Sequence, residues 1–130
     1  MTAPAFHSKR GERACSEILL DFGAPLLEPL GSAPLSVWRD ALTLVVTTWN
    51  ALVIDEALGG SQTLTELRVR VRLLPEPGGL FFADAVEALV IRKQEHFGEE
   101  RWTVGHWKLT RPGGELRLRV EVHAPPVRPP

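Results

Sequence analysis

One stretch of the sequence, residues 41–54, contains no charged residue and reads ALTLVVTTWNALVI. It lies between Asp40 and Asp55 in a chain in which 24% of the residues are charged. A membrane-spanning helix needs about 20 apolar residues, so this stretch is too short to be one. It is also too evenly apolar for a helix with one face in water. We therefore expect it to be covered on nearly all sides, either by the rest of the chain or by a partner.

The apolar spacing predicts that this stretch belongs to a helix over residues 36–58. Ser36 is a suitable N-cap, and the glycines at 59 and 60 are typical of a helix end. Large apolar residues recur at steps of four and three, as on one helix face: Trp38, Leu42, Val45, Trp49 and Leu52. The opposite side is also uncharged, and a partner could cover it. It consists of Leu44, Thr47, Thr48 and Ala51.

The other segments indicate an α+β fold, with about three helices packed on a small antiparallel sheet that ends in a C-terminal β-hairpin. Residues 80–97 have helical apolar spacing, with acidic residues early and basic residues late. Residues 102–111 and 115–123 alternate apolar and polar side chains around a Pro-Gly-Gly turn, which is typical of a hairpin. Residues 18–22 also alternate and could add a third strand, although their apolar spacing also fits a helix.

Residues 62–74 fit two structures. Thr63 and Glu66 form a capping-box pattern, and the apolar residues that follow have helical spacing. The segment LRVRVRL also alternates strictly, and as a strand it would align Arg68, Arg70 and Arg72 on one face. We favour the helix, in which these arginines do not form a stripe.

Length and composition are those of a single globular domain. A chain of 130 residues can bury a core without disulfides or metals, and its one cysteine, Cys15, excludes an internal disulfide. We expect a flexible arm over residues 1–16, a domain over residues 17–123 and a Pro-rich tail over residues 124–130. The net charge of -1, from 15 basic and 16 acidic residues, gives no bulk attraction to nucleic acid or to an anionic membrane. The first residues lack the apolar core of a secretory signal, so we expect a cytoplasmic protein.

No sequence motif for nucleotide binding, metalloprotease, serine hydrolase or calcium chemistry occurs in the chain. We assign no catalytic residue, no metal ligand and no cofactor. His96 and His106 could meet near the start of the hairpin, but we favour exposed histidines over a metal site there. Asn50 lies inside the uncharged stretch and needs a hydrogen-bond partner if it is enclosed. That partner could be a loop backbone or a facing helix across an interface.

Candidate interaction residues lie on the hairpin and on the uncharged stretch. Trp102 and Trp107 have opposite parity, so we expect one of them on the outer face of the hairpin. An exposed Trp beside Arg117 and Arg119 could anchor a protein interface or stack on a nucleobase. The candidate set is Trp102, Trp107, Lys108, Arg117, Arg119, Thr47, Thr48 and Asn50.

The succession of WNALVIDEALGG, a helix bounded by prolines, LVIRKQEHF and a Trp-rich hairpin resembles small bacterial proteins without a named family. The resemblance covers residues 17–123. It implies a bacterial protein, and it implies no activity, cofactor or site residue.

We expect a non-enzymatic protein–protein interaction module, acting by self-association or through a protein partner and without membrane contact. Such a module would be a subunit or a neutralising partner in an operon-encoded bacterial complex. A first alternative is a nucleic-acid-binding accessory protein that uses Lys108, Arg117, Arg119 and the segment 68–72. A second alternative is an enzyme with an unrecognised site. Its site would lie near Asn50, Asp55, His96 and His106.

Overall fold

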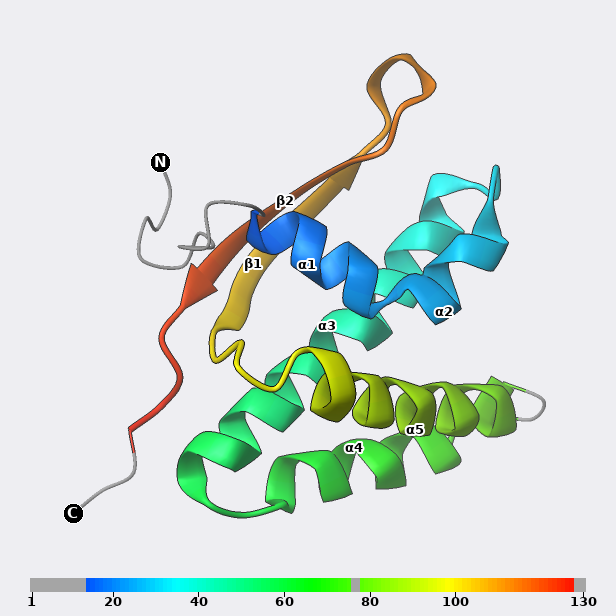
Figure 1. Ribbon diagram of the computed structural model, residues 1–130. Helices are drawn as coiled ribbons and strands as arrows, with labels where there is room; N and C mark the ends of the chain where they lie inside the picture. Colours follow the sequence, from blue (N-terminus) through cyan, green and yellow to red (C-terminus); the bar gives the residue numbers. More distant parts are fainter. Residues whose placement is uncertain (1–13, 76–77, 128–130) are drawn as a thin grey trace.

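A computed structural model describes residues 14–75 and 78–127. This part of the chain forms five α-helices and one antiparallel hairpin (Figure 1). The helices are α1 (Cys15–Phe22), α2 (Ala24–Leu27), α3 (Leu35–Leu58), α4 (Gln62–Arg72) and α5 (Gly78–His96). The hairpin consists of β1 (Thr103–Thr110) and β2 (Arg117–His123), and 3-10 turns occur at Glu28–Leu30 and Pro112–Gly114. The mixed α and β class is confirmed, whereas the expected number of about three helices is too low.

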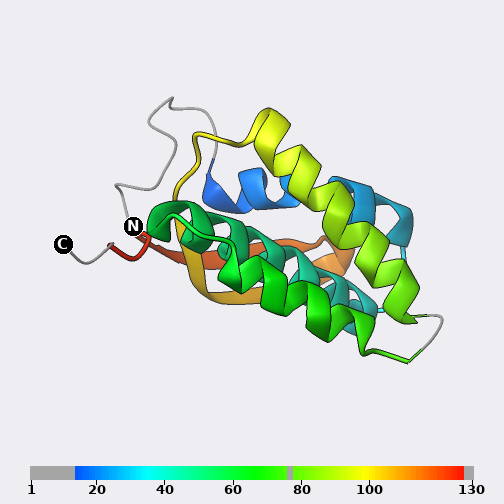
Figure 2. The ribbon, with the colours of Figure 1, turned by 90° about the horizontal axis from the view of Figure 1, so that it is seen from below.

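Helix α3 runs through the centre of the molecule. It packs against β1 on one side and against α4 and α5 on another, and α1 and α2 complete the core near the hairpin (Figure 1). Seen from below, α4 and α5 lie side by side along α3 (Figure 2). Leu42, Val45 and Trp49 of α3 are fully buried. The helix therefore contributes residues to two core clusters, one beside the hairpin and one beside α4 and α5.

The side of α3 that was left open in the sequence is covered in large part by the chain itself. Thr48 and Ala51 are buried at 0% and 1% exposure, and Leu44 packs in both core clusters. The Thr47 and Thr48 hydroxyls donate to helix carbonyls one turn back, those of Thr43 and Leu44. Leu44 and Thr47 remain half-buried, and Thr43 is exposed.

Residues 18–22 form part of helix α1, so the expected third strand is wrong. Cys15, Ile18, Leu19 and Phe22 are the buried residues of α1, and their spacing is that of one helix face. Leu20 lies on another side of the helix, where it is partly buried against the same core cluster. The apolar alternation of Ile18, Leu20 and Phe22 therefore comes from a helix with two apolar sides. Of the predicted arm, residues 1–13 lie outside the described residues, and Cys15 and Ser16 already belong to α1.

The ends of α3 and α4 differ in part from the expected caps. Helix α3 begins at Leu35 after Pro34, so Ser36 lies inside the helix and is not its N-cap. Gly59 ends α3 with a left-handed φ of 75°, a conformation that favours glycine. The segment 62–72 is helical as favoured, but Thr63 and Glu66 form no capping box, because the helix begins at Gln62 and Thr63 lies inside it.

A β-bulge at Gly105 reverses the side-chain parity of β1. Val104 pairs with Val122 and His106 with Glu121, so Gly105 is an extra residue without a partner on β2. Trp102 and Val104 before the bulge, and Leu109 after it, are all buried, and Trp107 packs partly buried on the same core. The expectation that Trp102 and Trp107 point to opposite faces is therefore wrong, because it assumed an unbroken alternation.

Helix α3 is also long and apolar enough to cross a membrane, judged by length and composition alone among the described helices. Its most apolar window has a mean hydropathy of 1.3, and half of that window is buried inside the fold. The core helix of a soluble protein meets the same criterion, so this feature is weak evidence for a membrane span.

Candidate functional site

Asn50 links α3 to the first strand of the hairpin. Its Nδ2 donates to the carbonyl of Val104 at 2.9 Å, and its Oδ1 accepts from the Val104 N–H at 2.8 Å. The two suggested partners of Asn50 were a loop backbone and a facing helix, and its partner is instead the backbone of strand β1. The amide group thus pairs with β1 as a neighbouring strand would.

Asp55 caps α4 from the neighbouring helix. Its two carboxylate oxygens accept the backbone N–H groups of Thr63 and Leu64, both at 2.9 Å, and the residue is only 8% exposed. These N–H groups belong to the first turn of α4, where the helix has no partner of its own to offer. Asp55 is therefore engaged in holding two helices together.

Lys93 is a buried cation, 4% exposed, at the end of α5. Its Nζ donates to the carbonyls of Phe97 at 2.8 Å and Glu100 at 3.0 Å, and it lies 4.8 Å from the centroid of the Trp49 ring. Burial of the ammonium group lowers the pKa of Lys93, and the nearby carboxylates of Glu56 and Glu100 oppose that shift. Sequence reasoning gave Lys93 no role, although its helical spacing from the buried residues Val86, Leu89 and Phe97 is a signal for its burial.

Cys15 is poorly suited to act as a nucleophile. Burial of the thiol, assisted by the negative charge of Glu100, raises the pKa of Cys15 to about 11. At neutral pH the reactive thiolate is therefore a very minor species.

The residues suggested for an enzyme site serve the fold or lie on the surface. Asn50 and Asp55 bond to backbone as described above. His106 lies opposite Glu121 on the hairpin, and the exposed His96 side chain lies 3.9 Å from Glu95. Within the described ranges, no group of three or more His, Cys, Asp or Glu residues could hold a metal ion.

Three candidate cations do come together, on the outer face of the hairpin. Lys108 lies directly opposite Arg119, and Thr110 lies directly opposite Arg117. A hollow of about 400 Å³ lies over them. It is lined by Lys108, Thr110, Pro112, Arg117, Leu118 and Arg119. We call Lys108, Arg117 and Arg119 the cationic cluster, and all three residues are exposed.

No ion pair joins the cationic cluster to a carboxylate in the part of the chain that the structure describes. The other sequence candidates lie elsewhere: Trp102 and Trp107 face the core, and Thr47, Thr48 and Asn50 lie on α3. The cationic cluster is therefore the portion of the candidate set that stays available at the surface.

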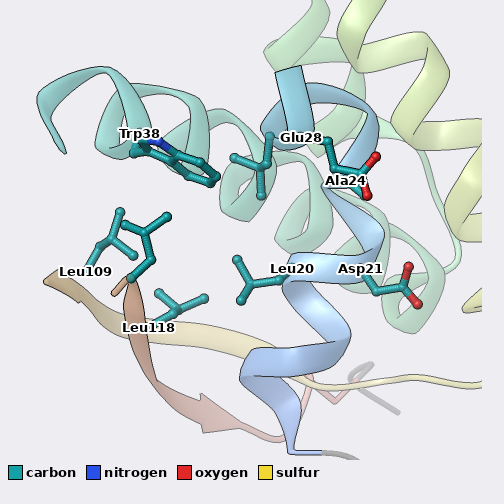
Figure 3. A pocket seen from close by; sticks show the side chains of 9 residues that line it. Leu20, Asp21, Ala24, Glu28, Trp38, Leu109 and Leu118 are labelled. Atoms are coloured by element: carbon teal, nitrogen blue, oxygen red, sulfur yellow. The ribbon is translucent and has the colours of Figure 1, made fainter. Parts of the chain in front are cut away.

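The opposite face of the hairpin borders an apolar groove of about 330 Å³. Figure 3 shows Leu20, Trp38, Leu109 and Leu118 converging on it from α1, α3 and the two strands. Its lining consists of Leu20, Asp21, Ala24, Leu27, Glu28, Trp38, Leu109, Leu116 and Leu118. Sequence reasoning missed this groove because its walls come from segments that lie far apart in the sequence. Leu118 lies beside both the groove and the hollow of the cationic cluster.

Comparison with known proteins gives no match to a family model, a curated protein or a solved structure.

Proposed function

We propose that the protein is a non-enzymatic protein-interaction module that binds an acidic surface of a partner through the hairpin. The observation that carries this proposal is the cationic cluster. Like charges placed directly opposite on neighbouring strands destabilise a hairpin, and Lys108 and Arg119 are so placed. An anionic partner would remove this repulsion on binding. We place the protein in the cytoplasm, as a subunit or a neutralising partner in an operon-encoded bacterial complex.

The state of the interior polar groups supports a binding role over catalysis. Asn50, Asp55 and Lys93 each bond to backbone groups of a neighbouring segment. Each is therefore committed to joining elements of the fold, whereas a catalytic acid or base needs access to a substrate proton. The apolar groove and the hollow of the cationic cluster contain none of these three residues.

A charge-reversal pull-down tests the proposal. Arg117→Glu/Arg119→Glu reverses two of the three charges of the cationic cluster, and Arg70→Glu/Arg72→Glu makes the same charge change at exposed positions of α4. In nuclease-treated lysate of the source cells, we expect wild type and the α4 variant to retain one common protein. The hairpin variant should lose it, and titration with the purified partner should show at least tenfold weaker binding. Equal retention by all three proteins would refute the proposal.

A nucleic-acid-binding accessory role is the second candidate, because a hollow lined by Lys108, Arg117 and Arg119 also suits phosphate groups. Fluorescence anisotropy with labelled 20-nucleotide RNA and 20-base-pair DNA tests it. Phosphate binding must weaken steeply as salt rises from 50 to 300 mM and must be lost in Arg117→Glu/Arg119→Glu. Absence of binding at 50 mM salt would eliminate this candidate.

A further inference from the structure

We propose that the outer edge of β2 binds an extended segment of the partner as an added strand, and that this segment alternates acidic and apolar residues. The inference rests on the proposed function and specifies its partner. It combines three features of the hairpin: a strand edge that is unpaired among the described residues, the cationic cluster on one face and the apolar groove on the other.

The open edge follows from the hydrogen-bond pattern of the hairpin. In antiparallel strands, residue pairs alternate between those that bond to each other and those whose backbone groups point away. Val104 gives both its N–H and its carbonyl to Asn50, so the pair Val104–Val122 belongs to the second kind. The register then turns the backbone groups of Leu118, Val120 and Val122 away from β1.

The two edges of the hairpin differ in how they are covered. The outer edge of β1 is closed by α3, through Asn50 at Val104 and through Arg39, whose Nη2 donates to the Leu109 carbonyl at 3.2 Å. On β2, Leu118, Val120 and Val122 make no further backbone hydrogen bond to any described residue outside the hairpin. Helix α1 contacts β2 but forms no backbone hydrogen bond with it. An edge that is unpaired in this way is a template for an added strand.

The side chains on either face of β2 specify what the added strand should carry. Successive residues of a strand point to opposite faces of a sheet. On the outer face, its side chains would lie beside Arg117 and Arg119, which favours acidic residues there, and beside the exposed Glu121, which does not. On the inner face they would lie beside Leu116 and Leu118 at the groove, which favours apolar residues. A nucleic acid offers neither the backbone donors nor the alternating apolar side chains, so we assign the edge to a protein segment.

Three peptides test strand addition on the full-length protein. The first, acetyl-EVEVEVE-amide, has the proposed pattern, and the second, acetyl-KVKVKVK-amide, reverses its charge. The third is the acidic peptide N-methylated at its valines, which in antiparallel addition would direct their amides at β2. By NMR titration we expect the first peptide to bind, and the other two to bind at least tenfold more weakly. The double variant Arg117→Glu/Arg119→Glu should reverse the charge preference.

Amide exchange reports on the edge itself. In the free protein, the amides of Leu118, Val120 and Val122 should exchange faster than those of Arg119 and Glu121, which face β1. The acidic peptide should slow exchange at the first three at least tenfold. Val120→Pro removes an edge N–H without breaking the ladder to β1, so the folded variant should lose the peptide. If that variant does not fold, the comparison of the acidic peptide with its N-methylated form tests strand addition instead.

Three results would overturn the inference. They are equal binding of the N-methylated peptide, no binding of the acidic peptide at 1 mM, and binding of an oligonucleotide that the acidic peptide cannot displace. None of the peptide results decides the proposed function, because the lysate pull-down tests the cationic cluster with an intact partner. The partner could be lost in Arg117→Glu/Arg119→Glu but retained by folded Val120→Pro. That result would support the proposed interaction module and exclude strand addition.

Discussion

At the level of single residues, the interior polar side chains form hydrogen bonds that connect one element to another. Asn50 and Trp49 reach from α3 to the backbone at Val104 and Trp102, the latter by a bond of 2.8 Å from the indole N–H. Asp55 reaches from the same helix to α4. No buried side-chain nitrogen or oxygen among the described residues lacks a hydrogen-bond partner. Specificity of packing around α3 therefore depends on a few directed bonds as well as on apolar contact.

Asp55→Ala should destabilise the protein by about 2 to 3 kcal/mol, because two N–H groups at the start of α4 lose their acceptor. Asp55→Asn keeps one acceptor oxygen and should lose less. Urea denaturation followed by far-UV circular dichroism measures both. The control is Asp40→Ala, an exposed carboxylate of the same helix, which should change stability by no more than about 0.5 kcal/mol. Equal effects of Asp55→Ala and Asp40→Ala would contradict the capping role.

The Cys15 thiol should make stability fall at alkaline pH. In the unfolded chain the thiol has its ordinary pKa of 9.0, and in the folded protein its pKa is raised to about 11. Between these pH values the folded state binds more protons than the unfolded state. The contribution of Cys15 to the free energy of unfolding is therefore complete below pH 9 and is lost as the pH passes 11. Lys93, whose pKa is lowered, acts in the opposite direction, but it is present in wild type and variant alike.

The measurement is the difference in unfolding free energy between wild type and Cys15→Ala at a series of pH values. The difference should be constant below pH 9 and should shift against wild type between pH 9 and 11. A constant difference across that range would show that the thiol titrates alike in both states.

At the level of elements, the bulge in β1 decides which face of the hairpin is apolar. One extra residue at Gly105 lets Trp102 and Val104 before it, and Trp107 and Leu109 after it, all face the core. Without the bulge, the side chains on one side of it would exchange faces. Lys108 of the cationic cluster faces outward for the same reason.

Deletion of Gly105 should destabilise the protein by at least about 4 kcal/mol, because either Trp107 and Leu109 or the residues before them must leave the core. Gly105→Ala is the matched control. Gly105 has no positive φ, and a β-carbon there would overlap only the exposed ring of His123, which can turn away. We expect the alanine variant to lose about 1 kcal/mol or less. Near-UV circular dichroism and urea denaturation distinguish the two, and a native-like deletion variant would disprove the role of the bulge.

At the level of the whole molecule, α3 packs against its own chain on two sides, and half of its most apolar window is buried. The hairpin with α1 and α2 covers one part of it, and α4 with α5 covers another (Figure 1). Its polar side chains Thr48, Asn50 and Asp55 are all bonded within the fold. Transfer of this helix into a bilayer would break the bonds of Asn50 and Asp55 and expose both core clusters.

We therefore expect the folded protein not to bind lipid vesicles. In a flotation assay with vesicles of phosphatidylcholine and phosphatidylglycerol, it should remain in the bottom fraction at 150 mM salt. Arg117→Glu/Arg119→Glu serves as control for contact of the cationic cluster with the anionic lipid. Flotation of both proteins would indicate that α3 leaves the core and inserts.

The sequence predicted those features that depend on neighbouring residues. Four such features were predicted correctly: the end of α3 at Gly59, the turn of the hairpin, the core positions of Trp38 and Trp49, and the helix at 62–72. Each depends on local spacing or on a turn residue. The helix over 15–22 was open between two structures, because Leu20 lines the groove while Ile18 and Phe22 enter the core. That second apolar side imitates the alternation of a strand.

The sequence alone determined the central apolar helix and the C-terminal hairpin. Helix periodicity, strand alternation and turn chemistry are properties of residues close together in the chain. Only the tertiary structure decided which face each side chain took and which polar groups met. The bulge at Gly105, the Asp55 cap on α4 and the Asn50 pairing with Val104 each join residues that the chain's own periodicity does not relate. The open edge of β2 also depends on these contacts, since α3 closes the edge of β1 and leaves that of β2 unpaired within the described fold.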